Sequence, residues 1–259
     1  MRWPALAYPS GDVTATARLV ARGLAVAALS LAAAAATAAP DGPVWLGRFD
    51  SDDKTWREVR LKAELKPNTF TLREWDGHAA LEVKSAASMS LMARPLRVDL
   101  ARTPVLCWRW RIDAPLAQAD LLRRAGDDYA ARLYVSLSLP DRDKSLALRA
   151  QLRFARTIWG PEVPDAAINY VWDNRQPVGT ERPNAYTDRT TMIVLRSGAA
   201  EAGRWVQERR HLGRDIARLH GPAAVPVQLA VTADTDNTGE SARAGFADLH
   251  LVAENSQCQ

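Results

Sequence analysis

Oxygen-bearing side chains crowd one short segment near the end of the chain. Asp234, Asp236 and Thr238 alternate there, and Gly239 follows. This spacing matches the first half of an EF-hand loop, but Gly245 stands where that loop requires a bidentate glutamate, so an EF-hand is excluded. The segment predicts either a smaller calcium site, in which Asp50, Asp248 or a backbone carbonyl completes the ligands from these three side chains, or an Asx-type turn that satisfies its own backbone.

A second group combines arginine with tyrosine at alternating positions. Arg109 and Arg111 share one face of an expected strand, and Arg132 and Tyr134 share one face of the next. If the two strands are neighbours, the four side chains cluster, and arginine forks recognise carboxylate or phosphate groups through paired hydrogen bonds. The alternative is an exposed sheet face on which arginines pair with acids.

Paired acids precede the second of these strands. Asp127 and Asp128 could bind a cation, orient the arginines or act as acid and base. Alternatively, one acid caps a turn and the other pairs with Arg132. Together with Asp234 or Asp236, either acid could also form the carboxylate pair of a glycosidase-like hydrolase or a lyase.

Aromatic residues give the third group. Tyr170 and Trp172 lead into a polar loop, where they would either hold a sugar ring or end a core strand. Trp108 and Trp110 alternate with arginines, and this pattern favours a place in the core. The sequence has no Gly-x-Ser-x-Gly elbow, phosphate loop or dinucleotide-binding glycine motif, and its histidines lack zinc-type spacing.

These residues need a scaffold, and the hydrophobic periodicity predicts one made of strands. The clearest are 105–112 and 129–139, and Asp76-Gly77 joins two others as a hairpin turn. Short helices are expected at 117–124 and 213–220. The full set of predicted strands is 44–49, 69–75, 79–84, 91–100, 105–112, 129–139, 168–172, 191–196, 205–210, 227–233 and 242–252. Many strands and few helices predict an all-β fold with minor α content, a two-sheet antiparallel β-sandwich of jelly-roll type.

The N-terminus reads as a leader. Arg18 and Arg22 precede an apolar run and then small residues, so we expect a signal peptide over 1–38, a single domain over 39–254 and a flexible tail over 255–259. Residues 1–17 are longer and more polar than a normal leader, which allows a true start codon downstream of Met1. The expected localisation is periplasmic or secreted, with no membrane span in the mature chain.

The charge of the chain bears on the partners that it could bind. Three arginines and one aspartate lie in the leader, so its removal lowers the net charge from +4 to +2, and the remaining basic residues are dispersed. This pattern argues against nucleic-acid binding.

The two cysteines lie in different surroundings. Cys107 lies in an apolar strand and Cys258 in the polar tail. Two free thiols are the favoured interpretation, and a disulfide that staples the tail is the alternative.

Several motifs together resemble an uncharacterised exported bacterial family, domain of unknown function 3047. They are Cys107-Trp108-Arg109-Trp110-Arg111, Gly126-Asp127-Asp128-Tyr129-Ala130-Ala131-Arg132, Asn169-Tyr170-Val171-Trp172, Trp205 with Asp215, and Asp234-Thr235-Asp236-Asn237-Thr238-Gly239. The resemblance spans about residues 44–252 and brings no established activity. The overall pattern also looks similar to galactose-binding and carbohydrate-binding jelly rolls, which often carry a structural calcium ion.

The sequence therefore favours a non-catalytic protein that binds a carbohydrate or another polar cell-envelope ligand, such as a glycan or an anionic small molecule. The expected ligand contacts are Arg109, Arg111, Arg132 and Tyr134, with Asp127 and Asp128 orienting the arginines. An envelope hydrolase or lyase and a structural protein that binds a protein partner are the alternatives.

Overall fold

The computed structural model describes residues 42–259 except Lys62, Pro161 and Glu162; the predicted leader lies outside these residues. Thirteen strands and two α-helices follow one another along the described chain. The strands are β1 Val44–Gly47, β2 Arg57–Val59, β3 Thr69–Trp75, β4 His78–Ala86, β5 Leu91–Pro95, β6 Val105–Ile112, β7 Tyr129–Ser138, β8 Ala166–Asp173, β9 Glu181–Asn184, β10 Thr187–Ser197, β11 Val206–His211, β12 Val225–Asp234 and β13 Ser241–Val252. The α-helices are α1 Leu146–Trp159 and α2 Leu212–His220.

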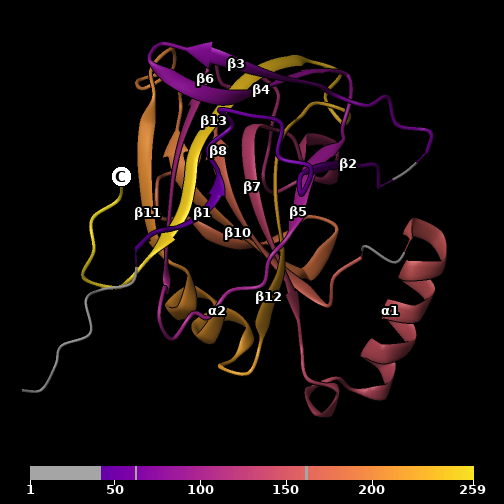
Figure 1. Ribbon diagram of the computed structural model, residues 1–259. Coiled ribbons are helices and arrows are strands. Elements are labelled where there is room, and N and C mark those ends of the chain that lie inside the picture. The colour runs from indigo at the N-terminus through magenta and orange to yellow at the C-terminus, as the bar shows by residue number, and fades with distance from the viewer. Residues whose placement is uncertain (1–41, 62, 161–162) are drawn as a thin grey trace, which may run out of the picture. The chain divides into compact units, whose positions relative to one another are not determined.

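The strands form two sheets that pack face to face, as Figure 1 shows. Sheet A has the order β11-β6-β13-β4-β3, with β1 also paired to β13. Sheet B has the order β2-β5-β12-β7-β8-β10-β9. The predicted two-sheet β-sandwich is confirmed. One difference is the parallel pairing of β8 with β10, which makes sheet B mixed.

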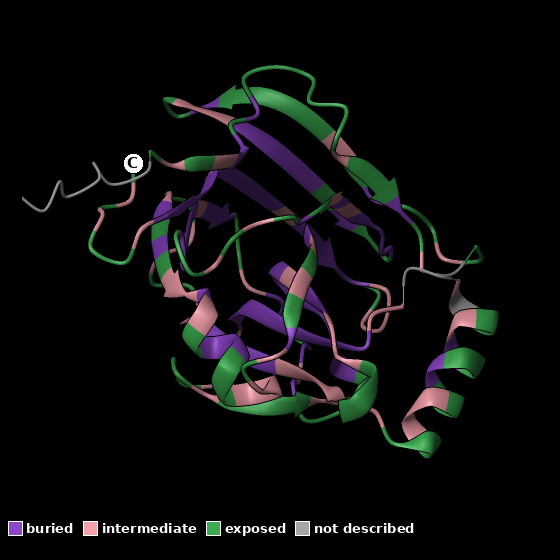
Figure 2. Cartoon of the chain, turned by 60° about the horizontal axis from the view of Figure 1, so that its bottom comes forward, coloured by how far each residue is buried: buried purple, intermediate pink, exposed green. Residues whose placement is uncertain are grey.

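The alternating sequences of β6 and β7 explain the core between the sheets. Trp108 and Trp110 point inward from sheet A, and their rings lie 5.5 and 5.8 Å from those of Tyr170 and Trp172 in sheet B. All four residues are buried, and the interior strand residues appear purple in Figure 2. The residues between the inward-facing ones must therefore point to the outer faces of the sandwich.

Two local predictions are confirmed in detail. Asp76 and Gly77 both have positive φ angles, 49° and 81°, between the paired residues Trp75 and His78. Positive φ at both central positions is what a two-residue type I′ hairpin requires. Helix α2 forms where a helix was expected, and it buries Ile216 against the core.

Two other predictions are wrong, and one helix was not predicted. No helix forms over 117–124; only a short 3₁₀ turn, Arg124–Gly126, follows. Helix α1, which begins at the N-cap Ser145, was not expected. Finally, Cys107 and Cys258 are not free thiols but form a disulfide, which covalently attaches the expected flexible tail to β6.

Neither α-helix of the described chain has the length and apolar character needed to cross a membrane.

Candidate functional site

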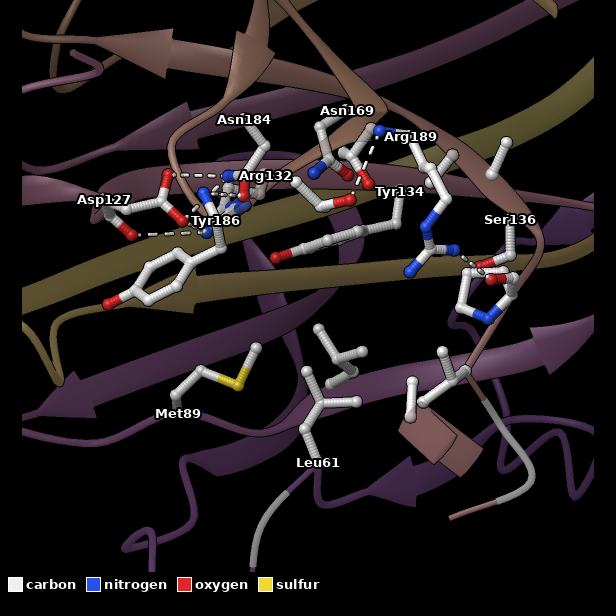
Figure 3. Close-up of a pocket in the computed structure, with 18 of the residues that line it drawn as sticks. Leu61, Met89, Asp127, Arg132, Tyr134, Ser136, Asn169, Asn184, Tyr186 and Arg189 are labelled. Atoms are coloured by element: carbon white, nitrogen blue, oxygen red, sulfur yellow. Dashed lines mark hydrogen bonds and ion pairs between the residues drawn. The ribbon is translucent and has the colours of Figure 1, made fainter. Parts of the chain in front are cut away.

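A cavity of about 650 Å³ opens on the outer face of sheet B. Its floor carries Arg132, Tyr134 and Ser136 of β7, with Asn169 of the neighbouring β8. Figure 3 shows these side chains pointing into the cavity beside Asn184, Tyr186 and Arg189. The volume lies within the range of about 300–1,000 Å³ that small-molecule sites occupy.

The cavity forms because β7 alternates. Leu133 and Val135 face the core, so Arg132, Tyr134 and Ser136 must face outward. Antiparallel pairing sets Arg132 opposite Thr232 and Tyr134 opposite Asn169, which gathers polar side chains of three strands on one surface.

Arg132 is the charged centre of this surface. Its guanidinium forms an ion pair with Asp234 and lies 3.9 Å from Asp127 Oδ2. The rings of Tyr129 and Tyr134 each lie 4.7 Å from its Cζ. Burial alone would lower the pKa of Arg132, but Tyr134 and these carboxylates outweigh it and raise the pKa, so the side chain stays charged.

The acids around Arg132 outnumber it four to one. Asp127 and Asp128 come from the turn before β7, and Asp234 and Asp236 from the end of β12 and the loop after it. One oxygen each of Asp128, Asp234 and Asp236 lies within 4.8 Å of the others. Burial first, and then the neighbouring carboxylates, raise the pKa of Asp234 against the opposing effect of Arg132. Acidic side chains therefore outnumber Arg132 at this end of the cavity.

Two of these acids mainly hold the loops in place. Asp128 accepts hydrogen bonds from the backbone N–H of Thr238 at 2.7 Å and from both nitrogens of Asn237. Asp127 accepts from Asn184 Nδ2 through both carboxylate oxygens, at 2.9 and 2.8 Å. The alternative in which one acid secures a turn and the other lies beside Arg132 thus describes the arrangement well.

The same contacts bear on a hydrolase. Of the acids considered as an acid–base pair, Asp127, Asp128 and Asp234 are engaged in ion pairs or hydrogen bonds, and Asp128 is fully buried. A general acid or base must reach the proton that it transfers. Asp128 lies out of such reach, and Asp127 and Asp234 would first have to leave their partners.

Two of the three residues predicted to bind calcium, Asp234 and Asp236, lie together with Asp128. Thr238 Oγ1 lies 3.4 Å from the backbone nitrogen of Glu240. Calcium takes six to eight oxygen ligands. An ion here would compete with Arg132 for Asp234 and with loop amides for Asp128, so calcium binding stays a prediction.

The predicted arginine cluster does not form, because β6 belongs to sheet A and β7 to sheet B. Arg109 donates from Nε to Asp248 Oδ2 at 3.0 Å, and Arg111 pairs with Asp76 over the Trp75 ring. Both therefore lie on the outer face opposite to the one that carries Arg132.

The two aromatic candidates are also wrong as exposed sugar platforms. Tyr170 and Trp172 are buried in the core. The Tyr170 hydroxyl donates to Asp215 at 2.7 Å, and Trp172 Nε1 donates to the Gly198 carbonyl at 3.0 Å. The core-strand alternative holds for both.

The sequence analysis missed Asn184, Tyr186 and Arg189, which come from β9, β10 and the turn between them. The Tyr186 hydroxyl lies 2.7 Å from Asn237 Oδ1, which links this turn to the loop between β12 and β13. Arg189 Nη1 donates to the carbonyls of Pro164 and Asp165, and burial lowers its pKa. The asparagine and tyrosine within a short polar turn between strands were the available signal.

Three polar atoms of cavity-lining residues have no hydrogen-bond partner among the described residues: Asp234 Oδ1, Asn169 Oδ1 and Arg132 Nε. All three residues are at least nine-tenths buried. A buried polar atom without a partner is unfavourable, and a polar ligand or water can relieve that cost.

These observations define a β-sandwich protein with an acidic cavity on one outer face. The chain belongs to the family described as "Protein of unknown function (DUF3047)", whose model matches residues 54–250. No curated protein matches the sequence. Among solved structures, the fold is similar to the xyloglucanase domain of NopAA, a type three effector from Sinorhizobium fredii, in complex with cellobiose. The identity is 8%, the TM-score is 0.39, and 77% of this chain and 93% of that chain are covered, a likeness too remote to support a function.

Proposed function

We propose that this protein is exported and binds a carbohydrate or another polar ligand of the cell envelope, without chemical conversion, in the cavity on the outer face of sheet B. The observation that carries the proposal is the cavity of about 650 Å³ whose floor combines the hydrogen-bonding side chains of Tyr134, Ser136 and Asn169. Sugar hydroxyls both donate and accept hydrogen bonds, so they suit a wall that offers donors and acceptors together.

Charge narrows the ligand further. Asp127 and Asp234 lie beside the Arg132 guanidinium and Asp236 lies near Asp234, so an uncharged polar ligand fits this end of the cavity better than the anionic one considered from sequence. The hydrogen bonds and ion pairs that hold Asp127, Asp128 and Asp234 favour binding over catalysis.

Export is supported by the disulfide. Bonds of this kind persist in oxidising compartments and are rare in the cytosol of most organisms. The predicted leader over 1–38 agrees with it. Periplasmic or secreted localisation thus belongs to the proposal.

The test is a calorimetric titration of the exported protein with neutral oligosaccharides and cell-envelope glycan fragments. Asn169→Ala removes an unpartnered oxygen whose amide nitrogen makes only a long contact to Met192 Sδ at 3.5 Å, so folding should survive. We expect affinity to fall at least tenfold in this variant, with the ligand recovered unchanged by mass spectrometry.

Asn174→Ala is the matched control, because Asn174 donates to the Ala119 carbonyl and does not line the cavity. It should bind like the wild-type protein. Equal affinity of Asn169→Ala and wild type, or release of a cleaved product, would contradict the proposal.

A further inference from the structure

The cavity has a second side with different chemistry. Besides the polar floor, the cavity is lined by Val59, Leu61, Leu65, Met89 and Leu91. Figure 3 shows Leu61 and Met89 across the cavity from Asp127, Tyr134 and Asn169. Val59, Met89 and Leu91 belong to a buried apolar cluster against which Leu61, Leu65 and Tyr134 pack, so this side is a continuous hydrophobic wall.

Helix α1 and the segment after it extend this wall. Phe154, Ala155 and Val163 also line the cavity, yet Phe154 is 67% exposed. An exposed phenylalanine beside an apolar cavity adds contact area that the folded protein leaves in water, and a bound apolar group would cover it.

The residue types on this wall are informative. Sugar rings are held by aromatic faces and hydrogen-bonding groups. The β2–β5 side instead offers branched aliphatic side chains and methionine, which bury alkyl groups without direction or hydrogen bonds. A hydroxyl-rich ligand alone would leave this wall unused.

Resting on the proposed function, we infer that the ligand is amphipathic: an alkyl chain lies against the aliphatic wall and Phe154, and an uncharged, hydroxyl-rich head lies against Asn169, Asp234 and Tyr134. The four acids near the head favour a neutral group over a sulfate or phosphate. Glycolipids and acylated sugars share this chemistry.

The probes are octyl glucoside, glucose and octyl sulfate, each titrated below its micelle-forming concentration into the full exported protein by calorimetry. We expect octyl glucoside to bind at least tenfold more tightly than glucose, because the chain removes apolar surface from water. We also expect it to bind at least tenfold more tightly than octyl sulfate, which brings a negative charge to an acidic site.

Two variants of α1 locate the chain. Phe154→Ala should weaken octyl glucoside binding at least threefold, whereas Ile158→Ala should not change it. Ile158 is 53% exposed on the same helix but does not line the cavity. Both side chains are largely in solvent, so neither variant should unfold the protein.

Equal affinity for octyl glucoside and glucose would overturn the inference and leave the proposed function to the oligosaccharide titration and Asn169→Ala. Equal or tighter binding of octyl sulfate would overturn the neutral head. Equal effects of Phe154→Ala and Ile158→Ala would place the chain elsewhere, and failure of octyl glucoside to bind would overturn the inference outright.

Discussion

The outer faces of both sheets carry arginines and acids, but in different proportions. Cations outnumber the acid on sheet A, and acids outnumber the arginine on sheet B. On sheet A, the buried Glu82 is surrounded by Arg73, Lys84 and Arg243, and the guanidinium of Arg243 also stacks 4.0 Å from the Trp75 ring centroid. On sheet B, four acids surround Arg132 beside a cavity. Arginines and acids on a strand therefore do not by themselves mark a site. What distinguishes sheet B is the cavity beside these charged side chains.

The largest effect should come from breaking the disulfide between Cys107 and Cys258, which holds the C-terminal tail on sheet A. Cys258→Ser removes a disulfide that spans 151 residues, and loop-closure entropy then predicts a loss of about 2–5 kcal/mol in the free energy of unfolding. Denaturant melts of wild type and variant measure it. Because the tail lies on sheet A, ligand affinity at sheet B should stay unchanged. A loss of affinity would mean that the two faces are coupled.

Close packing on sheet A gives the next effect. A Cβ at Gly245 would lie 2.8 Å from the Trp205 ring, 3.2 Å from Arg111 Cγ and 3.2 Å from the Trp75 ring. We expect Gly245→Ala to cost about 1–3 kcal/mol, because the rings must move apart. Thermal unfolding measures it, with Gly42→Ala as a control that meets no atom within 4 Å. Equal melting temperatures would show that this face is looser than the distances indicate.

Two variants that each neutralise one carboxylate test this difference between the two outer faces. Glu82→Gln should cost about 1–2 kcal/mol, because the pKa of Glu82 is lowered overall: burial raises it, but Arg243 and the other cations lower it more. Asp234→Asn should cost less or stabilise the protein, because burial and neighbouring acids raise the pKa of Asp234. Chemical denaturation of both variants at pH 7 compares them. A greater loss in the free energy of unfolding for Asp234→Asn than for Glu82→Gln would contradict this prediction.

The tail on sheet A should also respond to pH. Burial lowers the pKa of His250 below its usual 6.5, and its Nε2 accepts the backbone N–H of Gln259 at 3.1 Å. As the pH falls below about 6.5, the unfolded chain binds a proton before the folded one does, so stability is lost with acidification. His250→Gln removes this titration. Melting temperatures between pH 7.5 and 5 should fall more steeply in the wild-type protein, and parallel profiles would contradict the assignment.

The smallest effect concerns sheet B and calcium. If Asp234 and Asp236 bind the ion with Asp128, chelator should lower the melting temperature and added calcium should restore it. We expect at most a few degrees, because Arg132 and loop amides already occupy these acids. Asp236→Asn should abolish the response. An identical shift in that variant would place any calcium effect elsewhere.

Strands with strict alternation were predictable. In β6 and β7 every second residue is apolar, and both strands formed within one residue of the predicted bounds. Their assignment to different sheets was not predictable, because periodicity reports the face that a residue occupies and not the neighbour of its strand. For this reason Arg109 and Arg111 were wrongly expected to lie beside Arg132.

Helix α1 was also missed. Its buried residues Leu152 and Ala155 lie on one face, but Leu146, Phe154 and Ile158 are exposed. The segment nevertheless keeps a helical period and has Ser145 as its N-cap, so the signal for this helix was present in the sequence and was overlooked. The structure brings some of the candidate residues to one place: Arg132, Tyr134, Asp127 and Asp234 all line the cavity. Its aliphatic wall comes from segments with no chemical signature of their own.

The position of β13 has a consequence for biogenesis. This strand follows all the others in sequence, yet it sits in the interior of sheet A, paired with β1, β4 and β6. Synthesis proceeds from the N-terminus, so sheet A has a vacant centre until nearly the whole chain has been made. Pairing between distant segments is slow, and half-built sheets expose edges that aggregate.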